Sequence, residues 1–123
     1  MGFIFETFLR SIRAASTHVE GMANSDVVKM LSNLIANGWW RNVAEAEGYL
    51  AGWIVAANDN HMAWIYVRDM FRWRNYKDHP VTDMLLSGSN IDPSRRIVTP
   101  FLPNRNKRSW QFAHRPFLVM PNG

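Results

Sequence analysis

The sequence of 123 residues contains no cysteine. This absence excludes disulfide bonds, thiolate zinc sites, iron–sulfur clusters and a cysteine nucleophile. It is compatible with a reducing compartment, so we expect a cytoplasmic protein or a component of a virion or larger complex. The length is enough for one domain and not comfortably for two.

Long apolar runs are also missing. The longest, Tyr49 to Ala57, has nine residues, whereas a membrane-spanning helix needs about 20. The first residues carry no basic stretch followed by a long apolar segment, so we expect no secretory signal and no membrane partner. The contents of 47% hydrophobic and 20% charged residues are typical of a globular domain.

Proline is missing from residues 1–79, and all six prolines lie between 80 and 121. Because proline breaks helices, the first part permits them and the second does not. Residues 1–79 hold eight basic and eight acidic side chains, whereas 80–123 hold six and two, so the net charge of 6 − 2 = +4 belongs to the second part. We therefore predict a helical domain over 1–79 and a basic, proline-rich extension over 80–123, packed on the domain or on a partner.

The spacing of apolar residues predicts two helices at the N-terminus. The first has an apolar face of Phe5, Phe8, Leu9 and Ile12. The second has one apolar stripe, is capped by Asn24 or Ser25 and stops at Gly38. Its stripe consists of Val27, Val28, Leu31, Leu34 and Ile35.

Two further helices are predicted over 42–57 and 61–76. The apolar residues of the third follow helical spacing, and Asn58, Asp59 and Asn60 end it. A buried strand fits residues 62–67 equally well, but no turn signal interrupts the chain from Arg68 to Trp73. The predicted fold class is therefore mainly α, a compact bundle of about four helices.

Small side chains recur every fourth residue of the predicted third helix. Two glycines inside a helix each cost about 1 kcal/mol relative to alanine, which close approach of another helix would offset. Packing within the chain is favoured over self-association as the explanation. The residues of this helix-packing stripe are Ala44, Gly48, Gly52 and Ala56.

The extension is predicted to be irregular, with short strands. Residues 97–102 and 109–114 flank a plausible hairpin loop over 103–107. Trp110, Phe112 and His114 alternate with polar or small residues, as in a half-buried strand. Pro100 restricts the first of these strands to a sheet edge, and residues 87–89 are predicted to form a turn.

Aromatic and basic residues gather in three places that suggest binding. The segment 71–77 interleaves them, Trp39 and Trp40 precede Arg41, and the extension carries more. Exposed tryptophan beside arginine is typical of protein interfaces, although packing of both Trp39 and Trp40 over the helical core is the favoured alternative. Stacking aromatics among cations are typical of single-stranded nucleic-acid sites. The predicted partner-binding residues are Trp39, Trp40, Arg41, Arg72, Arg74, Arg95, Arg96, Arg105, Lys107, Arg108, Trp110, Phe112 and Arg115.

Signals for catalysis are weak. The pairs His18 with Glu20, Asp59 with His61, and Asp78 with His79 place titratable groups near one another. None of them has metal-ligand spacing, and phosphate-binding or nucleophile motifs are missing. We therefore expect no enzyme, metal or cofactor.

The favoured function is a non-enzymatic interaction or assembly protein that binds a protein partner or itself through its basic aromatic C-terminal arm. Small accessory proteins of phages, plasmids or multi-subunit complexes are of this type. The alternative is nucleic-acid binding through the arm and the 71–77 segment. Its affinity would fall steeply with salt.

Overall fold

The two N-terminal helices form where the hydrophobic spacing predicts them. In the computed structural model, which describes residues 2–16, 19–72, 80–103 and 110–116, α1 spans Gly2–Ala15 and α2 spans Asn24–Ala36. The predicted cap is not used, because Ala23 precedes α2 and makes no side-chain cap bond. Gly38 follows the end of α2 with a φ of 104°, a conformation that glycine adopts without strain.

Strands replace the predicted third and fourth helices. Trp40–Ala46 forms β1, Tyr49–Ala57 forms β2 and His61–Val67 forms β3. Between β1 and β2, Glu47 and Gly48 have φ values of 51° and 82°. Two successive residues with positive φ form the type I′ turn that joins antiparallel strands.

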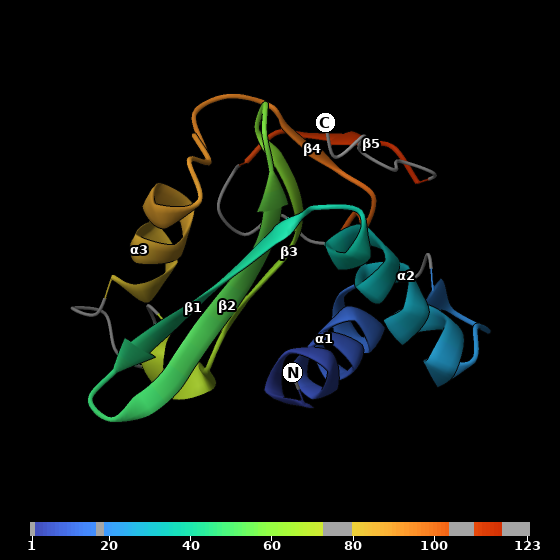
Figure 1. Cartoon of the computed structure of the whole chain (residues 1–123), viewed down its shortest axis with the longest axis horizontal. Helices are drawn as coiled ribbons and strands as arrows, with labels where there is room; N and C mark the ends of the chain where they lie inside the picture. The colour runs from blue at the N-terminus through green and yellow to red at the C-terminus, as the bar shows by residue number, and fades with distance from the viewer. Residues whose placement is uncertain (1, 17–18, 73–79, 104–109, 117–123) are drawn as a thin grey trace.

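The prediction of a mainly α four-helix bundle is therefore wrong. The part of the chain that is described contains three α-helices and a five-stranded mixed sheet (Figure 1). The third helix is α3, Val81–Gly88, within the region predicted to be irregular, and it includes two residues of the predicted 87–89 turn. A short 3₁₀ helix, η2, covers Asp69–Phe71 after β3.

The sheet has the order β1-β2-β3-β4-β5. The first three strands are antiparallel, whereas β4 (Ile97–Thr99) and β5 (Phe112–His114) pair in parallel. The predicted hairpin between them is therefore wrong, since a hairpin joins antiparallel strands. The predicted edge position is also wrong: β4 lies between β3 and β5, and Pro100 follows its last residue.

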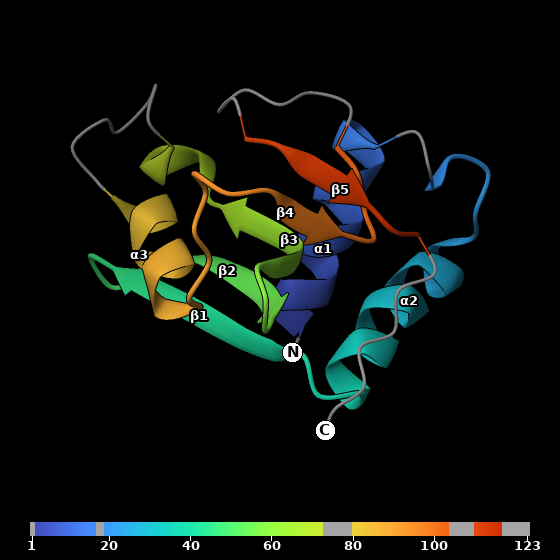
Figure 2. The same ribbon diagram turned by 90° about the horizontal axis from the view of Figure 1, so that it is seen from above.

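Helices cover both faces of the sheet. Figures 1 and 2 show α1 and α2 on one face and α3 on the other. Two apolar clusters fill these layers, with Phe8, Leu31, Trp53 and Trp64 in the first and Ile54, Phe71, Leu85 and Ile97 in the second. Strands from before and after residue 80 share this sheet.

The predicted helix-packing stripe lies on a hairpin. Ala44 is paired with Gly52 across the β1–β2 ladder, Ala56 is paired with Trp40, and Gly48 lies in the turn. A β-carbon at Gly52 would lie 2.4 Å from the carbonyl oxygen of Tyr66. A close backbone approach does occur at Gly52, but its neighbour is strand β3. Among the helices described, none is long and apolar enough to cross a membrane.

Candidate functional site

β4 pairs with β3 over only a short distance. The recorded β3–β4 register is His61 with Val98, and the Val98 amide donates to the Asn60 carbonyl over 3.0 Å. Donors to one neighbour alternate along a strand, so the next position that would donate to β3 is Pro100, directly after β4. Proline has no amide hydrogen, so the next hydrogen bond of this ladder cannot form, and the pairing stays limited to His61 with Val98.

The buried side chain of Asn60 holds the start of β4 in place. Its Nδ2 donates to the carbonyls of Asp92 and Arg96, both over 3.0 Å, and its Oδ1 accepts the Asp92 amide over 2.7 Å. Asn60 has a φ of 62°, a left-handed conformation that asparagine tolerates better than most residues. This one side chain therefore fixes the segment that precedes β4 against the end of the β2–β3 turn.

Beyond Pro100 the chain turns away from β3. Phe101 enters the first apolar cluster, with its ring 5.4 Å from that of Phe8. The Thr99 hydroxyl accepts the Phe101 amide over 3.1 Å and lies 3.4 Å from the Ala63 carbonyl oxygen. The second half of β3 is thereby separated from β4.

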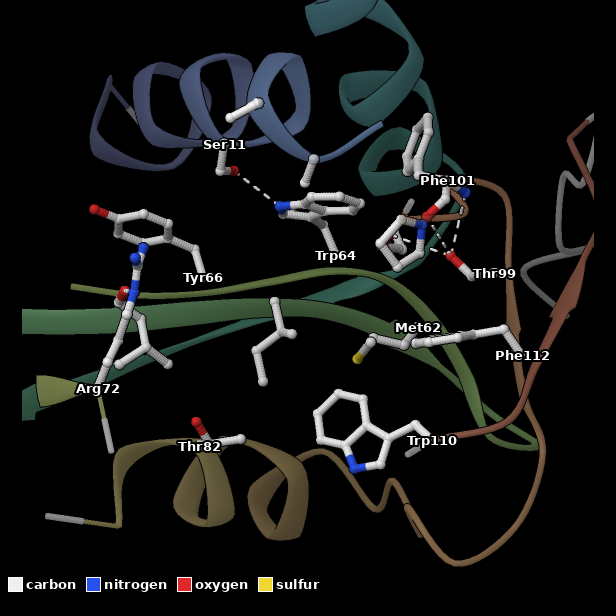
Figure 3. Close-up of a pocket in the computed structure, with 16 residues that line it drawn as sticks. Ser11, Met62, Trp64, Tyr66, Arg72, Thr82, Thr99, Phe101, Trp110 and Phe112 are labelled. Carbon is white, nitrogen blue, oxygen red and sulfur yellow. Dashed lines mark hydrogen bonds between the residues drawn. The ribbon is translucent and has the colours of Figure 1, made fainter. Parts of the chain in front are cut away.

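A cleft of about 690 Å³ opens where the two strands diverge (Figure 3). Its lining includes the consecutive residues 62–67 of β3. Successive side chains of a strand point to opposite faces of the sheet. Because consecutive residues of β3 line this cleft, the cleft must run along the edge of the strand.

Backbone groups of Ile65 point from this edge into the cleft. The Arg68 amide donates to the Ala51 carbonyl over 2.7 Å, which sets the phase of the antiparallel β2–β3 ladder. Trp64 and Tyr66 therefore bond to β2, and the amide and carbonyl of Ile65 face the opposite side. Within the described ranges, no strand pairs with Ile65 on that side.

Arg72 closes one end of the edge. Its Nε donates to the Val67 carbonyl over 2.8 Å, so the last acceptor on this side of β3 has a partner. The Arg72 guanidinium carbon lies 5.8 Å from the centre of the Tyr66 ring, and its Nη1 lies 3.4 Å from Asp69 Oδ1. Arg72 is the charged residue among the described residues that line the cleft.

The two walls of the cleft are largely apolar. On the side of α1, Trp64 donates its indole N–H to Ser11 Oγ over 2.8 Å, and Tyr66 and Phe101 lie beside it (Figure 3). On the other side, the rings of Trp110 and Phe112 are 6.3 Å apart. Small or polar side chains also line the cleft, among them Ala14, Ala15, Thr82 and Thr99.

The predicted partner-binding residues lie in different places. Arg72, Trp110 and Phe112, which are far apart in the sequence, line this one cleft. Trp39 is buried in the first cluster, and Trp40 packs against the second on the opposite face. Exposed positions are taken by Arg41, Arg95, Arg96 and Arg115, and the residues outside the described ranges are Arg74, Arg105, Lys107 and Arg108.

Sequence reasoning missed Trp64, Tyr66 and Phe101 as cleft residues. Trp64 and Tyr66 were missed because residues 61–76 were predicted to form a helix. Phe101 was missed because residues 97–102 were predicted to form one strand of a hairpin. A strand over 62–67, which fitted equally well, would have placed Trp64 and Tyr66 on one face. The proline that follows β4 was the available signal that the strand pairing ends there.

Of the three titratable pairs, Asp59 with His61 is the one that lies wholly within the described residues. His61 Nδ1 lies 2.7 Å from the Asn58 carbonyl oxygen, and Asp59 is exposed in the turn. His18, Asp78 and His79 fall outside the described ranges. In the described part of the chain, no three histidine, aspartate or glutamate side chains are grouped as metal ligands.

Comparison of this chain with protein families, with curated proteins and with solved structures finds no match. Its function must therefore be inferred from the cleft and from the exposed surfaces of the fold.

Proposed function

We propose that this chain is a non-enzymatic binding protein that takes up an extended polypeptide segment as an added strand on the outer edge of β3. The observation that carries the proposal is that consecutive residues 62–67 of β3 line one cleft. Addition of a strand to an exposed edge is a common mode of peptide recognition, in which main-chain hydrogen bonds give affinity and side-chain pockets give specificity.

The free length of the edge limits the segment to a few residues. A strand rises roughly 3.3 Å per residue, so the edge from Ala63 to Val67 is about 13 Å long. The Ile65 amide and carbonyl lie near its middle, and Arg72 occupies the acceptor at its end. We therefore expect four or five peptide residues in the cleft, with their central residue bonded to Ile65.

The walls indicate the side chains that the segment carries. Trp64, Tyr66 and Phe101 face one side of the added strand, and Trp110 and Phe112 face the other. A strand with both faces covered is apolar at successive positions rather than at alternate ones. The expected ligand is therefore a continuous run of apolar residues without proline at the position that donates to Ile65.

The test uses decapeptides selected on the folded protein from a random displayed library and then synthesised. Ile65→Pro removes the outward amide, while the bonds of Trp64 and Tyr66 to β2 stay possible, and it is expected to weaken peptide binding at least about tenfold. Ile65→Val is the matched control, since it keeps the amide. Circular dichroism checks that both variants are folded.

A scan of N-methylated peptides gives a second readout that needs no variant of the protein. Methylation of a backbone amide that donates to β3 removes a hydrogen bond, whereas methylation of its neighbour affects an amide pointing away. Affinity should therefore fall at every second position across the central residues. Equal losses at all positions, or unchanged binding by Ile65→Pro, would refute strand addition in this cleft.

A further inference from the structure

We propose that the outer edge of β1 is a self-complementary interface through which two copies of this chain join their sheets around a two-fold axis. β1 is an end strand of the sheet, and Figure 2 shows it at the outer border of the layers. This inference is independent of the cleft at β3, because a different strand and different side chains carry it.

Alternate residues of β1 direct their backbone amides and carbonyls to the outer edge, as such a pairing requires. Because the Ala51 carbonyl accepts the amide of Arg68, the residue after β3, the alternating residues Gly52 and Ile54 of β2 direct their amides and carbonyls to β1. Their partners Ala44 and Asn42 point back to β2. Val43 lies between these two residues, and Arg41 and Glu45 flank them. The register with β2 shifts between Ala44 and Glu45, where Ala51 of β2 is skipped, but the alternation along β1 itself continues. The backbone groups of Arg41, Val43 and Glu45 therefore point to the outer edge of β1, with which no described strand pairs.

The side chains of the same three residues share one exposed face. In β1, exposed residues alternate with more buried ones, and Arg41, Val43 and Glu45 are the exposed set. Val43 is 46% exposed and lies between the two charged residues on this face. The helices α1 and α2 cover the part of this face formed by β2 and β3, and the three β1 residues on the face remain exposed.

The order of these residues matches a two-fold axis at Val43. In an antiparallel pair centred on Val43, Arg41 lies directly opposite Glu45 of the second copy, and Glu45 lies opposite Arg41. Both opposed pairs then combine opposite charges on the same face as Val43. Each of these three residues would form a hydrogen-bonded pair with its opposite residue in the second copy, because its backbone amide and carbonyl point outward.

Charge complementarity therefore favours a second copy over an unrelated strand. An isologous contact of this type closes on itself, since each β1 edge is used once. Charged residues on an edge strand also occur as a device against association. Charges that join two copies and charges that prevent association predict opposite results when variants of opposite charge are mixed. An experiment can therefore separate the two roles.

The first measurement is sedimentation equilibrium of the full chain at concentrations up to about 1 mM, the range of weak interfaces of small area. The wild-type protein is expected to form dimers. Arg41→Glu and Glu45→Arg should each weaken the dimer at least about tenfold, because each places like charges opposite one another at two positions. Both residues are exposed, so the variants keep the fold, which circular dichroism verifies.

The decisive measurement mixes the two single variants. In a mixed pair, the two glutamates of the Arg41→Glu chain face the two arginines of the Glu45→Arg chain. The two variants that fail to pair with themselves should therefore form a heterodimer with each other. The double variant R41E/E45R should likewise recover a homodimer. A monomeric wild-type chain, or single variants whose association is not restored by mixing, would overturn the proposal.

Ile65→Pro serves as the control that separates the two edges. It alters the edge of β3 and leaves β1 unchanged, so dimerisation should persist even where peptide binding is lost. Loss of the dimer by Ile65→Pro together with its retention by Arg41→Glu would place the contact at the cleft and refute pairing through β1.

Discussion

The indole N–H of Trp53 donates a hydrogen bond to the hydroxyl oxygen of Thr7 over 2.6 Å, and both side chains are buried. The hydroxyl in turn donates to the Phe3 carbonyl of its own helix over 2.6 Å. One turn further along α1, Ser11 accepts the indole N–H of Trp64. These two bonds fix α1 across β2 and β3, so they also set the position of one wall of the cleft.

Replacement of Thr7 by valine should destabilise the protein by about 1–3 kcal/mol, because the buried indole N–H of Trp53 loses its acceptor while the shape of the side chain is kept. Urea denaturation measures the difference. Thr7→Ser is the control, since it keeps the hydroxyl and removes one methyl group, at a cost of about 0.8 kcal/mol. Equal losses in both variants would show that packing, and not the hydrogen bond, is responsible.

Gly52→Ala should be among the more costly small substitutions in this chain. The added β-carbon would lie 2.4 Å from the Tyr66 carbonyl oxygen and 3.3 Å from the Leu85 side chain, so β3 must move. Overpacking of this kind costs about 1–3 kcal/mol. Gly88→Ala is the control: nothing lies within 4 Å of its β-carbon, and in a helix alanine is up to about 1 kcal/mol better than glycine. Thermal unfolding of both variants should shift in opposite directions.

The turn between β1 and β2 offers a stabilising change. Glu47 adopts a φ of 51°, which asparagine tolerates better, and Asn-Gly is the preferred pair for a type I′ turn. Glu47→Asn should therefore stabilise the protein by about 0.5–1 kcal/mol in urea denaturation. Gly48→Ala should destabilise it by about 1 kcal/mol. Its β-carbon meets no atom within 4 Å, so that loss is conformational. A stabilising Gly48→Ala would contradict this account of the turn.

The two N-terminal helices were predictable from sequence because each buries one face. In α1 the residues Phe8 and Ile12 are fully buried at helical spacing, and Arg10 between them is exposed. A period of 3.6 is visible only when the opposite side is polar. The same condition holds for α2, where Val27, Leu31 and Leu34 are buried.

Strand β2 was not predictable in this way because all its residues from Ala51 to Ala57 are buried. A strand covered on both faces has no alternation, so its apolar residues also fit a helical pattern. Gly48 then extended a stripe of small residues, although its role is to turn the chain. The cleft could not be predicted because it depends on the parallel pairing of β4 with β3. Pro100 marks a break in pairing, but the sequence does not show which strand β4 pairs with.

The loop before β4 allows a prediction on pH. Asp92 accepts hydrogen bonds from the Ser94 hydroxyl over 2.6 Å and from the Ser94 amide over 3.0 Å, and both favour the ionised carboxylate. These bonds, the side-chain bond foremost and with a smaller contribution from Arg95, hold the pKa of Asp92 below its usual value. A lowered pKa in the folded state means that ionised Asp92 stabilises the fold above the unfolded pKa near 3.9.

That contribution should be lost as the pH falls from about 4 through the folded pKa of Asp92. Carbon-detected NMR titration of the Asp92 carboxyl should give a pKa below that of an aspartate in a model peptide. Ser94→Ala removes the hydroxyl and should raise the pKa toward the usual value, whereas Ser87→Ala, at an exposed serine of α3, should leave it unchanged. Asn60 binds the backbone of Asp92 and not its carboxylate, so Ser94→Ala leaves the Asn60 contacts in place. An equal titration curve in wild type and Ser94→Ala would mean that the Ser94 hydroxyl does not set this pKa.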